Sequence, residues 1–383
     1  MTAATRLQSI RVRNFKAIID SGVVKLGPLN VFIGYNDFIG YNDAGKSSLI
    51  EALETYQAIV HDGLDVAMRR WFGIEHARHK GQETKGRQGR KVSPIGFNLS
   101  IGASPRNASR LTMTVDNDPA FNEIFISGED IRLQDGTLLT RDSTGAGVGK
   151  GQSLLNRPPV GFRELAETVL RWQFLTLSPE RMGPPVPQQR TGGGVYLARD
   201  GSNIADFLLD LRRQDQNAFD GIVETMDYVL PYAKDIAPSL TSSEIERKAW
   251  LQLTESDFKV PGWMLSAGTL RLLALLALLR HPKPPPLILI EEIENGLDPR
   301  SMHVIVDEIR NAVLNGVNQV ILTTHSPYLL DLLTLEYLVL VERDGNGSPR
   351  FRRPADDDSL AAWADDFSPG KLYTMGSLSG YRP

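Results

Sequence analysis

A glycine-rich segment that ends in a lysine and a serine is the strongest chemical signal in the sequence. The segment Gly40 to Ser47 has the pattern G-x-x-x-x-G-K-[ST] and stands between a predicted strand and a predicted helix, as a phosphate-binding loop requires. Lys46 would reach the terminal phosphates and the Ser47 hydroxyl would bind Mg²⁺. The alternative is a glycine-rich turn that contains a lysine by chance. The candidate phosphate-binding residues are Gly40, Asn42, Asp43, Ala44, Gly45, Lys46, Ser47 and Ser48.

Two adjacent glutamates follow the apolar run Leu287 to Ile290, which is typical of a buried strand. The carboxyl end of such a strand is where α/β sheets bind ligands. Adjacent acids repel each other unless a cation or a proton offsets them, and a Mg²⁺ bound with ATP phosphates offers that offset. We assign Glu291 to the metal and Glu292 to positioning or deprotonating the attacking water. The alternative is a solvated acidic turn that includes Glu294.

Two further segments have weaker signals. Ser266 and Gly268 precede a strongly apolar helical pattern and could present a helix N-terminus to phosphate, or Ser266 could be an ordinary helix cap with Gly268 incidental. His325 follows a second predicted buried strand, where a histidine can sense a γ-phosphate or hold the attacking water. A purely structural role for His325 is the alternative.

The order and spacing of these four motifs resemble the nucleotide-binding heads of ABC-type ATPases, particularly the SMC, RecF and OLD-like group. Segments 10–16, 26–30, 200–205 and the ending around 370–380 also look like that group. The resemblance implies an α/β P-loop NTPase fold: an ABC-type ATPase head with a mixed sheet core, an antiparallel β subdomain and a helical subdomain that carries the signature motif.

The resemblance also implies ATP and Mg²⁺ as cofactors and a homodimer in which two heads enclose two ATP molecules. Ser266 and Gly268 would then act on the ATP of the other head, the segment 295–298 with Asp298 would be the D-loop that touches the partner, and His325 would be the switch histidine. The catalytic residues would be Glu292 and His325, and the metal ligands Ser47 and Glu291.

Three features depart from the family pattern. Many ABC proteins have aspartate where this chain has Glu291, although the glutamate pair looks like the OLD-like branch. Ala267 stands in the signature where glycine or aspartate is usual. The Q-loop stays open among Gln82, Gln173 and Gln188.

The surrounding pattern indicates the elements that must position these residues. We expect strands over 9–15 and 29–33, a helix after Lys46, antiparallel hairpins over 95–141 with turns at 116–118 and 135–136, and helices around 162–172 and over 203–230. The last third alternates a helix over 269–279, a strand over 287–290, a helix around 301–314 and a strand over 319–323, which predicts a parallel sheet covered by helices.

We divide the head into four regions. Residues 1–68 form an N-terminal ATPase lobe with the phosphate loop, and 69–260 contain β-hairpin and helical insertions. Residues 261–345 form a C-terminal lobe with the signature, acid pair, D-loop and switch histidine, and 346–383 are a tail. Between residues 69 and 91, eight Lys or Arg stand against two Glu, which favours an exposed, mobile loop.

The composition predicts a large folded protein without disulfides. The chain has 383 residues, of which 41% are hydrophobic, and no cysteine, so neither disulfides nor thiolate metal sites hold the fold. Its longest apolar run, Leu272 to Leu279, is far shorter than the ~20 residues that span a bilayer. No secretory signal pattern begins the chain. We therefore expect a cytoplasmic protein without a membrane segment.

The first functional hypothesis is an ATPase that dimerises on ATP and drives a separate partner, in DNA maintenance or phage defence. We expect a separate effector because the chain has no room after His325 for the nuclease domain of OLD-like relatives. The alternative is a non-enzymatic DNA-binding or scaffold protein, in which the basic segment 69–91 contacts phosphates. A transporter ATPase is less favoured, because that class has a shorter segment between phosphate loop and signature.

A hexapeptide is repeated directly before the phosphate loop. Phe32 to Asp37 and Phe38 to Asp43 are identical, and only the second copy precedes Ala44. If the second copy ended the strand, Asn36 and Asp37 would enter a buried strand at a high desolvation cost. We therefore expect Phe32 and Ile33 to end the strand and residues 34–39 to bulge outward. A copy introduced by cloning or annotation is the remaining alternative.

The duplication predicts weaker nucleotide binding, because the extra residues leave the phosphate loop less preorganised. A variant that lacks one copy should bind ATP more tightly and turn it over faster than the full chain. Equal affinity and turnover in the two proteins, measured side by side, would contradict this prediction.

Overall fold

The computed structural model comprises two compact units. Unit 1 contains residues 1–172 and 333–383, and unit 2 contains residues 173–332. The four regions expected from the sequence remain predictions. The structure describes residues 5–34, 45–80, 83–86, 89–118, 120–141, 148–189, 194–242, 246–255, 257–316, 318–344, 347–358, 360 and 366–378.

An antiparallel sheet forms one part of unit 1, with strand order β10-β9-β8-β7-β1-β2 and β3 also paired to β1. Buried and more exposed residues alternate along β7, which is the pattern of a sheet with one covered face. The hairpins predicted over 95–141 are thus confirmed. The strands are β1 (Arg6–Phe15), β2 (Ile18–Asp20), β3 (Val24–Lys25), β7 (Ile95–Ser104), β8 (Asn107–Asp118), β9 (Glu123–Arg132) and β10 (Leu138–Thr140).

The turn predicted at 116–118 is wrong, whereas the turn at 135–136 is confirmed. Strand β8 continues through Asp118, which pairs with Glu123 of β9. Cross-strand pairing therefore outweighs the local turn preference of aspartate and asparagine. At the second turn, Gly136 has a φ of 90°, a conformation that glycine adopts readily.

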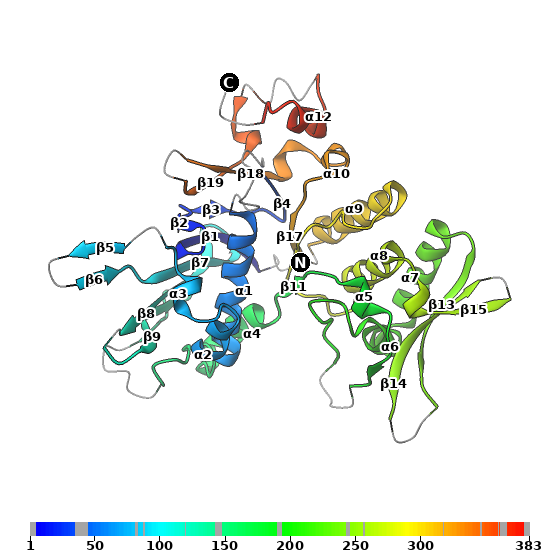
Figure 1. Ribbon diagram of the computed structural model, residues 1–383, viewed down its shortest axis with the longest axis horizontal. Helices are drawn as coiled ribbons and strands as arrows, with labels where there is room; N and C mark the ends of the chain where they lie inside the picture. The colour runs from blue at the N-terminus through cyan, green and yellow to red at the C-terminus, as the bar shows by residue number, and fades with distance from the viewer. Residues whose placement is uncertain are drawn as a thin grey trace. The chain divides into compact units, whose positions relative to one another are not determined.

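Helix α1 (Lys46–Asp62) covers this sheet, as the helical spacing after Lys46 predicts (Figure 1). Its apolar residues recur every three or four positions and are buried. The ring of Tyr56 packs edge-on against Phe97 of β7, with 5.8 Å between ring centroids. The other helices of this part are α2 (Leu64–Arg69), α3 (Ile74–Ala77), α4 (Arg163–Leu170) and the 3₁₀ turn η1 (Val160–Phe162).

Strand β4 (Leu29–Ile33) leads toward the phosphate loop and is buried along its whole length. It pairs in parallel with β18 (Leu338–Arg343), which pairs antiparallel with β19 (Pro349–Arg352). Phe32 and Ile33 of the first hexapeptide copy end the strand, as predicted. The bulge expected over residues 34–39 lies, apart from Gly34, outside the described part. The remaining elements here are η3 (Leu335–Tyr337), η4 (Pro354–Asp356) and α12 (Pro369–Thr374).

The basic segment 69–91, expected from its composition to be an exposed, mobile loop, is not a loop throughout. It contains the end of α2, helix α3 and most of a hairpin of β5 (Glu83–Gly86) and β6 (Gly89–Val92). Arg78 is buried, and its guanidinium donates to Asn117 at 2.8 Å and lies 3.3 Å from Asp116. A charge that looks solvated from its neighbours in sequence is thus part of the interior of unit 1.

Three parallel strands give unit 2 its frame. Strand β16 (Leu287–Ile290) pairs with β11 (Gln173–Leu175) and with β17 (Gln319–Thr323). Helix α8 (Ala267–Leu279) is mostly buried, and helix α9 (Pro299–Leu314) buries one face, so the predicted alternation of helix and strand is confirmed. Among the residues described, no helix has both the length and the apolar character needed to cross a bilayer. Short helices α5 (Pro179–Met182) and α10 (Pro327–Asp331) complete this part.

The rest of unit 2 combines a small antiparallel sheet with two helices. The helix predicted over 203–230 is two helices, α6 (Ile204–Gln214) and α7 (Gln216–Val229), because the carboxylate of Asp215 accepts a bond from the Ala218 amide and starts a new helix. The sheet consists of β12 (Val186–Pro187), β13 (Ala233–Leu240), β14 (Lys248–Glu255) and β15 (Phe258–Pro261), and the 3₁₀ turn η2 (Gly262–Met264) leads to α8.

A buried carboxylate fixes the segment that follows the sheet of unit 1. Glu129 of β9 is 2% exposed, accepts bonds from the Ser153 hydroxyl at 2.5 Å and the Leu154 amide at 2.9 Å, and lies 3.5 Å from Arg141. Burial raises the pKa of Glu129, and the hydrogen bonds and the arginine charge oppose that rise only in part. The folded state therefore binds this proton more tightly than the unfolded chain does.

The raised pKa of Glu129 predicts how stability changes with pH. As the pH falls from neutral toward the ordinary glutamate value of 4.5, the folded protein takes up this proton first, so its free energy of unfolding rises relative to that of Glu129→Gln. Urea unfolding of both proteins across this range measures the difference. The control is Glu167→Gln, at an exposed position of α4. A difference that stays constant with pH would contradict the prediction.

Candidate functional site

The start of α1 carries the described part of the phosphate loop. Gly45 has a φ of 106°, and a Cβ atom there would lie 2.5 Å from the side chain of Pro349 in β19, so both conformation and packing require glycine. Lys46 and Ser48 are buried, and Ser47 is partly exposed in the first turn. The predicted residues Gly40, Asn42, Asp43 and Ala44 lie outside the described part of the chain.

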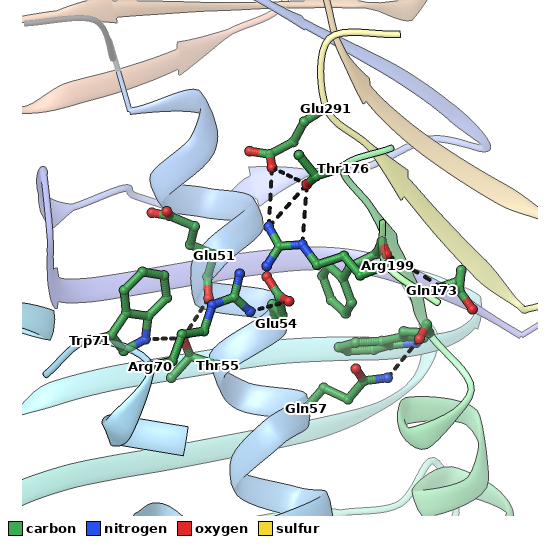
Figure 2. A network of polar contacts seen from close by, with 12 residues as sticks. Glu51, Glu54, Thr55, Gln57, Arg70, Trp71, Gln173, Thr176, Arg199 and Glu291 are labelled. Carbon is green, nitrogen blue, oxygen red and sulfur yellow. Dashed lines mark hydrogen bonds and ion pairs between the residues drawn. The ribbon is translucent and has the colours of Figure 1, made fainter. Parts of the chain in front are cut away.

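Side chains along α1 fix this helix within unit 1. Lys16 of the β1–β2 turn lies 2.6 Å from Glu51. The Trp71 indole N–H donates to the Thr55 hydroxyl at 3.0 Å (Figure 2). Gln57, two residues further along, donates to the Val169 carbonyl oxygen at 2.9 Å. The helix N-terminus, where backbone N–H groups can receive an anion, is therefore placed by polar contacts as well as by its apolar face.

Glu291 stands at the carboxyl edge of unit 2's parallel strands and contacts two residues that the sequence motifs do not include. Its Oε2 atom accepts a hydrogen bond from the Thr176 hydroxyl at 2.9 Å and lies 3.4 Å from the Arg199 guanidinium (Figure 2). Arg199 also donates to the Thr176 oxygen from two nitrogens, at 3.1 and 3.2 Å. Because that oxygen accepts from arginine, its own proton points to Glu291.

The arginine changes the interpretation of the acid pair. A cation was expected to offset Glu291 and Glu292, and within unit 2 the guanidinium of Arg199 is such a cation. Its side chain is 36% exposed and that of Glu291 18%, so solvent screens part of the attraction. Thr176 directly follows the short strand β11. Because α/β sheets bind ligands at the carboxyl ends of their strands, recognising β11 in the sequence would have indicated Thr176 as a site residue.

Glu292 is held in a backbone conformation that few non-glycine residues adopt. Its φ is 48°, which costs of order 1–3 kcal/mol and is found most often at functional sites. Its amide donates to the Thr323 hydroxyl at 2.9 Å, and its Oε2 atom accepts from the Asn295 side-chain amide at 2.5 Å. The side chain is exposed, so the carboxylate is both fixed and accessible to solvent.

His325 follows β17 at the same edge of the strands as Glu291. Its backbone N–H donates to the Glu294 Oε1 atom at 2.6 Å. The amide of Ile293 donates to the carbonyl oxygen of Thr323 at 3.3 Å, so the turn after β16 lies against the end of β17. Unit 2 thus brings together both predicted catalytic residues and the predicted metal-side acid.

The signature segment starts α8 with a side-chain cap. The Ser266 hydroxyl accepts a hydrogen bond from the Thr269 amide at 3.1 Å. This is the ordinary helix-capping role that the sequence offered as the alternative to phosphate binding. Gly268, by contrast, is not incidental, because a Cβ there would lie 2.4 Å from the carbonyl oxygen of Gly296. Arg271 of α8 donates to the Asn295 carbonyl oxygen at 2.8 Å. Both contacts join the start of α8 to the turn after the acid pair.

Asp298 caps α9, and its hydrogen bonds favour the charged form of its carboxylate. Its carboxylate accepts bonds from the amides of Arg300 and Ser301 at 2.9 and 3.0 Å and from the Ser301 hydroxyl at 2.7 Å. Burial alone would raise the pKa of Asp298, but these hydrogen bonds outweigh it and hold the pKa below the ordinary value. A role toward a partner remains a prediction for this residue.

The Q-loop stays open among the three glutamines. Gln173 is buried, and its side chain donates to the Leu197 carbonyl oxygen at 2.8 Å. The backbone N–H of Gln188 donates to the carbonyl oxygen of Arg247 at 3.0 Å. Gln82 lies outside the described residues.

Each unit contains one predicted ligand of a magnesium ion. Ser47 and Glu291 offer hydroxyl and carboxylate oxygens, the ligand type that Mg²⁺ prefers. In the described part of the chain, no three His, Cys, Asp or Glu side chains gather into a metal cage. Mg²⁺ in nucleotide sites needs none, since it keeps several waters and uses one or two protein ligands.

A family comparison covers most of the motifs. Residues 38–331 match the protein family described as "AAA domain, putative AbiEii toxin, Type IV TA system". The match begins at Phe38, the first residue of the second hexapeptide copy, and includes the phosphate loop, signature, acid pair and His325. No curated protein matches this chain.

Solved structures of SMC heads are similar to this chain. A crystal structure of an SMC head bound to the C-winged helix domain of ScpA has a TM-score of 0.54 and 13% identity, over 90% of this chain and 96% of that chain. The SMC head domain from Thermotoga maritima has a TM-score of 0.41 and 13% identity, over 91% of this chain and 98% of that chain. A Pyrococcus furiosus SMC head with an extended coiled coil, bound to the C-terminal domain of ScpA, has a TM-score of 0.46 and 10% identity. That match covers 91% of this chain and 96% of the other chain. The first of these shows the fold, which is the fold expected from the motifs.

The close approach of Gly268 to Gly296 predicts a large effect of a small substitution. Gly268→Ala should lower the free energy of unfolding by about 1–3 kcal/mol, because the new methyl group overlaps a backbone oxygen that cannot move freely. Gly221→Ala in α7 is the matched control, since its added Cβ would meet only an arginine nitrogen at 3.5 Å. Urea unfolding compares the two variants, and equal stability would contradict the prediction.

Proposed function

Because the chain belongs to this AAA domain family and has the fold of an SMC head, we propose that it binds ATP and hydrolyses it. One observation supports this proposal above the others. Glu291 and Glu292 stand at the carboxyl edge of parallel strands, each with its carboxylate held by a different neighbour, Thr176 for the first and Asn295 for the second. Such an edge is where parallel α/β sheets bind their ligands.

In the proposed mechanism, Glu292 positions or deprotonates the water that attacks the γ-phosphate. Its fixed and exposed carboxylate can accept that proton. His325 holds the water or senses the γ-phosphate from the neighbouring strand end. Lys46 and the N-terminal amides of α1 bind the phosphates, together with Gly40, Asn42, Asp43, Ala44, Gly45 and Ser48.

Ser47 and Glu291 would hold Mg²⁺, which supplies positive charge to the phosphate oxygens when bound. Thr176 keeps the Glu291 carboxylate turned toward the strand edge through its hydrogen bond. Arg199 places a positive charge 3.4 Å from the same carboxylate. These contacts describe what unit 2 contributes to metal binding.

We extend the proposal to a homodimer that closes over two ATP molecules. Ser266 and Gly268 stand at the N-terminus of α8, where they can face a phosphate bound by a second copy. Asp298 and the segment from Asn295 would touch that copy. Because the two ATP sites would share these segments, hydrolysis in the dimer would be coupled to its opening.

A separate effector completes the proposed function. The SMC heads in two of the solved structures are bound to domains of ScpA, and the family description names a toxin of a type IV TA system. We propose that this head likewise acts on a separate protein, within the cytoplasm and in phage defence or DNA maintenance. DNA contact through residues 69–91 belongs to the alternative of a nucleotide-dependent DNA-binding protein.

Glu292→Gln tests the proposed chemistry. The variant should keep ATP binding but lose turnover by roughly 100-fold or more, because an amide cannot accept the proton of the attacking water. It should also accumulate as an ATP-bound dimer, whereas the wild type returns to monomer as ATP is consumed. Turnover is measured by phosphate release and oligomeric state by light scattering, with and without ATP.

Glu336→Gln, at an exposed position in unit 1, is the control. If the wild type and Glu292→Gln hydrolyse ATP alike, Glu292 is not the general base. If the wild type binds ATP and dimerises without turnover, the non-enzymatic alternative is favoured.

A further inference from the structure

The turn after the acid pair makes two contacts to which the proposed mechanism assigns no role. In one, the Asn295 side chain donates to the Glu292 carboxylate. In the other, the Glu294 carboxylate accepts from the backbone of His325. We propose that Asn295 and Glu294 are positioning residues, of which Asn295 fixes the general base and Glu294 fixes the switch histidine. This inference rests on the roles proposed for Glu292 and His325.

Asn295 is suited to hold a carboxylate because it is itself held. Its backbone amide donates to the Glu292 carbonyl oxygen at 3.0 Å, and its own carbonyl oxygen accepts from Arg271 at 2.8 Å. The side-chain nitrogen then reaches the Glu292 Oε2 atom at 2.5 Å. An exposed glutamate ordinarily samples several rotamers, so this bond selects one of them and leaves the other carboxylate oxygen to accept a proton.

Glu294 acts on the other catalytic residue through the backbone. Its Oε1 atom accepts the His325 N–H at 2.6 Å, a hydrogen bond to a charged acceptor. Its Oε2 atom is buried and has no hydrogen-bond partner among the described residues. A buried oxygen without a donor is uncommon in folded proteins. The arrangement is explained if the side chain is placed for its contact with His325.

Both contacts come from one turn that is anchored to β17. The amides of Glu292 and Ile293 donate to the hydroxyl and carbonyl oxygens of Thr323, at 2.9 and 3.3 Å. Residues 292–296 therefore set the base and the histidine relative to each other. Loss of either positioning contact should lower the rate of the chemical step and leave ATP binding intact, because neither side chain is assigned to the phosphates.

The test compares kcat and KM for ATP across matched variants. Asn295→Ala and Glu294→Ala should each lower kcat by roughly ten- to a hundredfold, the size expected for a lost bond to a charged group, with KM changed less than about twofold. Asn295→Asp keeps the shape but removes the donor, so it should lose as much as Asn295→Ala. Glu294→Gln still offers an oxygen to His325 and should recover most of the rate. Asn311→Ala and Glu224→Ala, on exposed helix faces, are the controls.

Two further readouts separate positioning from general stability. Adding Asn295→Ala to Glu292→Gln should lower kcat no further, since Asn295 acts through Glu292. The His325 amide should exchange its hydrogen roughly tenfold or more faster in Glu294→Ala than in wild type, and at the wild-type rate in Asn295→Ala. Selective ¹⁵N-histidine labelling makes this measurable by NMR, because the chain has six histidines.

The outcomes distinguish this inference from the proposed function. If Glu292→Gln is inactive while Asn295→Ala and Glu294→Ala keep wild-type kcat and His325 exchange, the positioning inference is wrong and the proposed function stands. If Glu294→Gln loses as much as Glu294→Ala, an acceptor role for Glu294 is wrong. If Glu292→Gln hydrolyses ATP like the wild type, the general-base assignment fails first, and the role given to Asn295 fails with it.

Discussion

The register of three parallel strands is the constraint on which the candidate catalytic site of unit 2 depends. Leu175 pairs with Ile290, and Ile290 pairs with Leu322, so the residues that follow these positions emerge at one edge. Thr176, Glu291 and Thr323 meet there for that reason. A shift of one residue in either pairing would turn the side chains to the opposite face and separate them. The burial of the side chains of β16 and β17 thus fixes where the polar residues at the ends of these strands lie.

The residues after β16 show how a strained backbone can be tolerated at such an edge. Glu292 takes a left-handed conformation, and the next four residues form a turn that contacts β17 on one side and the start of α8 on the other. Gly268 lets α8 approach the carbonyl oxygen of Gly296 more closely than a Cβ atom would permit. Packing from two elements therefore stabilises a conformation that the isolated segment would rarely adopt.

The sequence predicts the strands and motifs of the site better than it predicts their contacts. Runs of mostly apolar residues mark β4, β16 and β17, because strands buried on both faces contain few polar residues. The partners of Glu291 lie 115 and 92 residues away in sequence, and no local pattern links them to it. Composition fails at Arg78 for the same reason, since its partner Asp116 lies 38 residues away in strand β8. What sequence patterns miss is the pairing of polar groups across the fold.

Unit 1 is assembled from both ends of the chain, and this has a consequence for how the protein is made. Strand β4 is synthesised early, but its parallel neighbour β18 follows only after the whole of unit 2. At about 5–20 residues per second, ribosomes need on the order of ten seconds or more for that interval. During this time the nascent chain holds β4, every residue of which is buried in the folded protein, without its neighbour β18, and Gly45 lacks the proline against which it packs. The part of unit 1 that contains the predicted phosphate loop is thus among the first parts translated and the last completed.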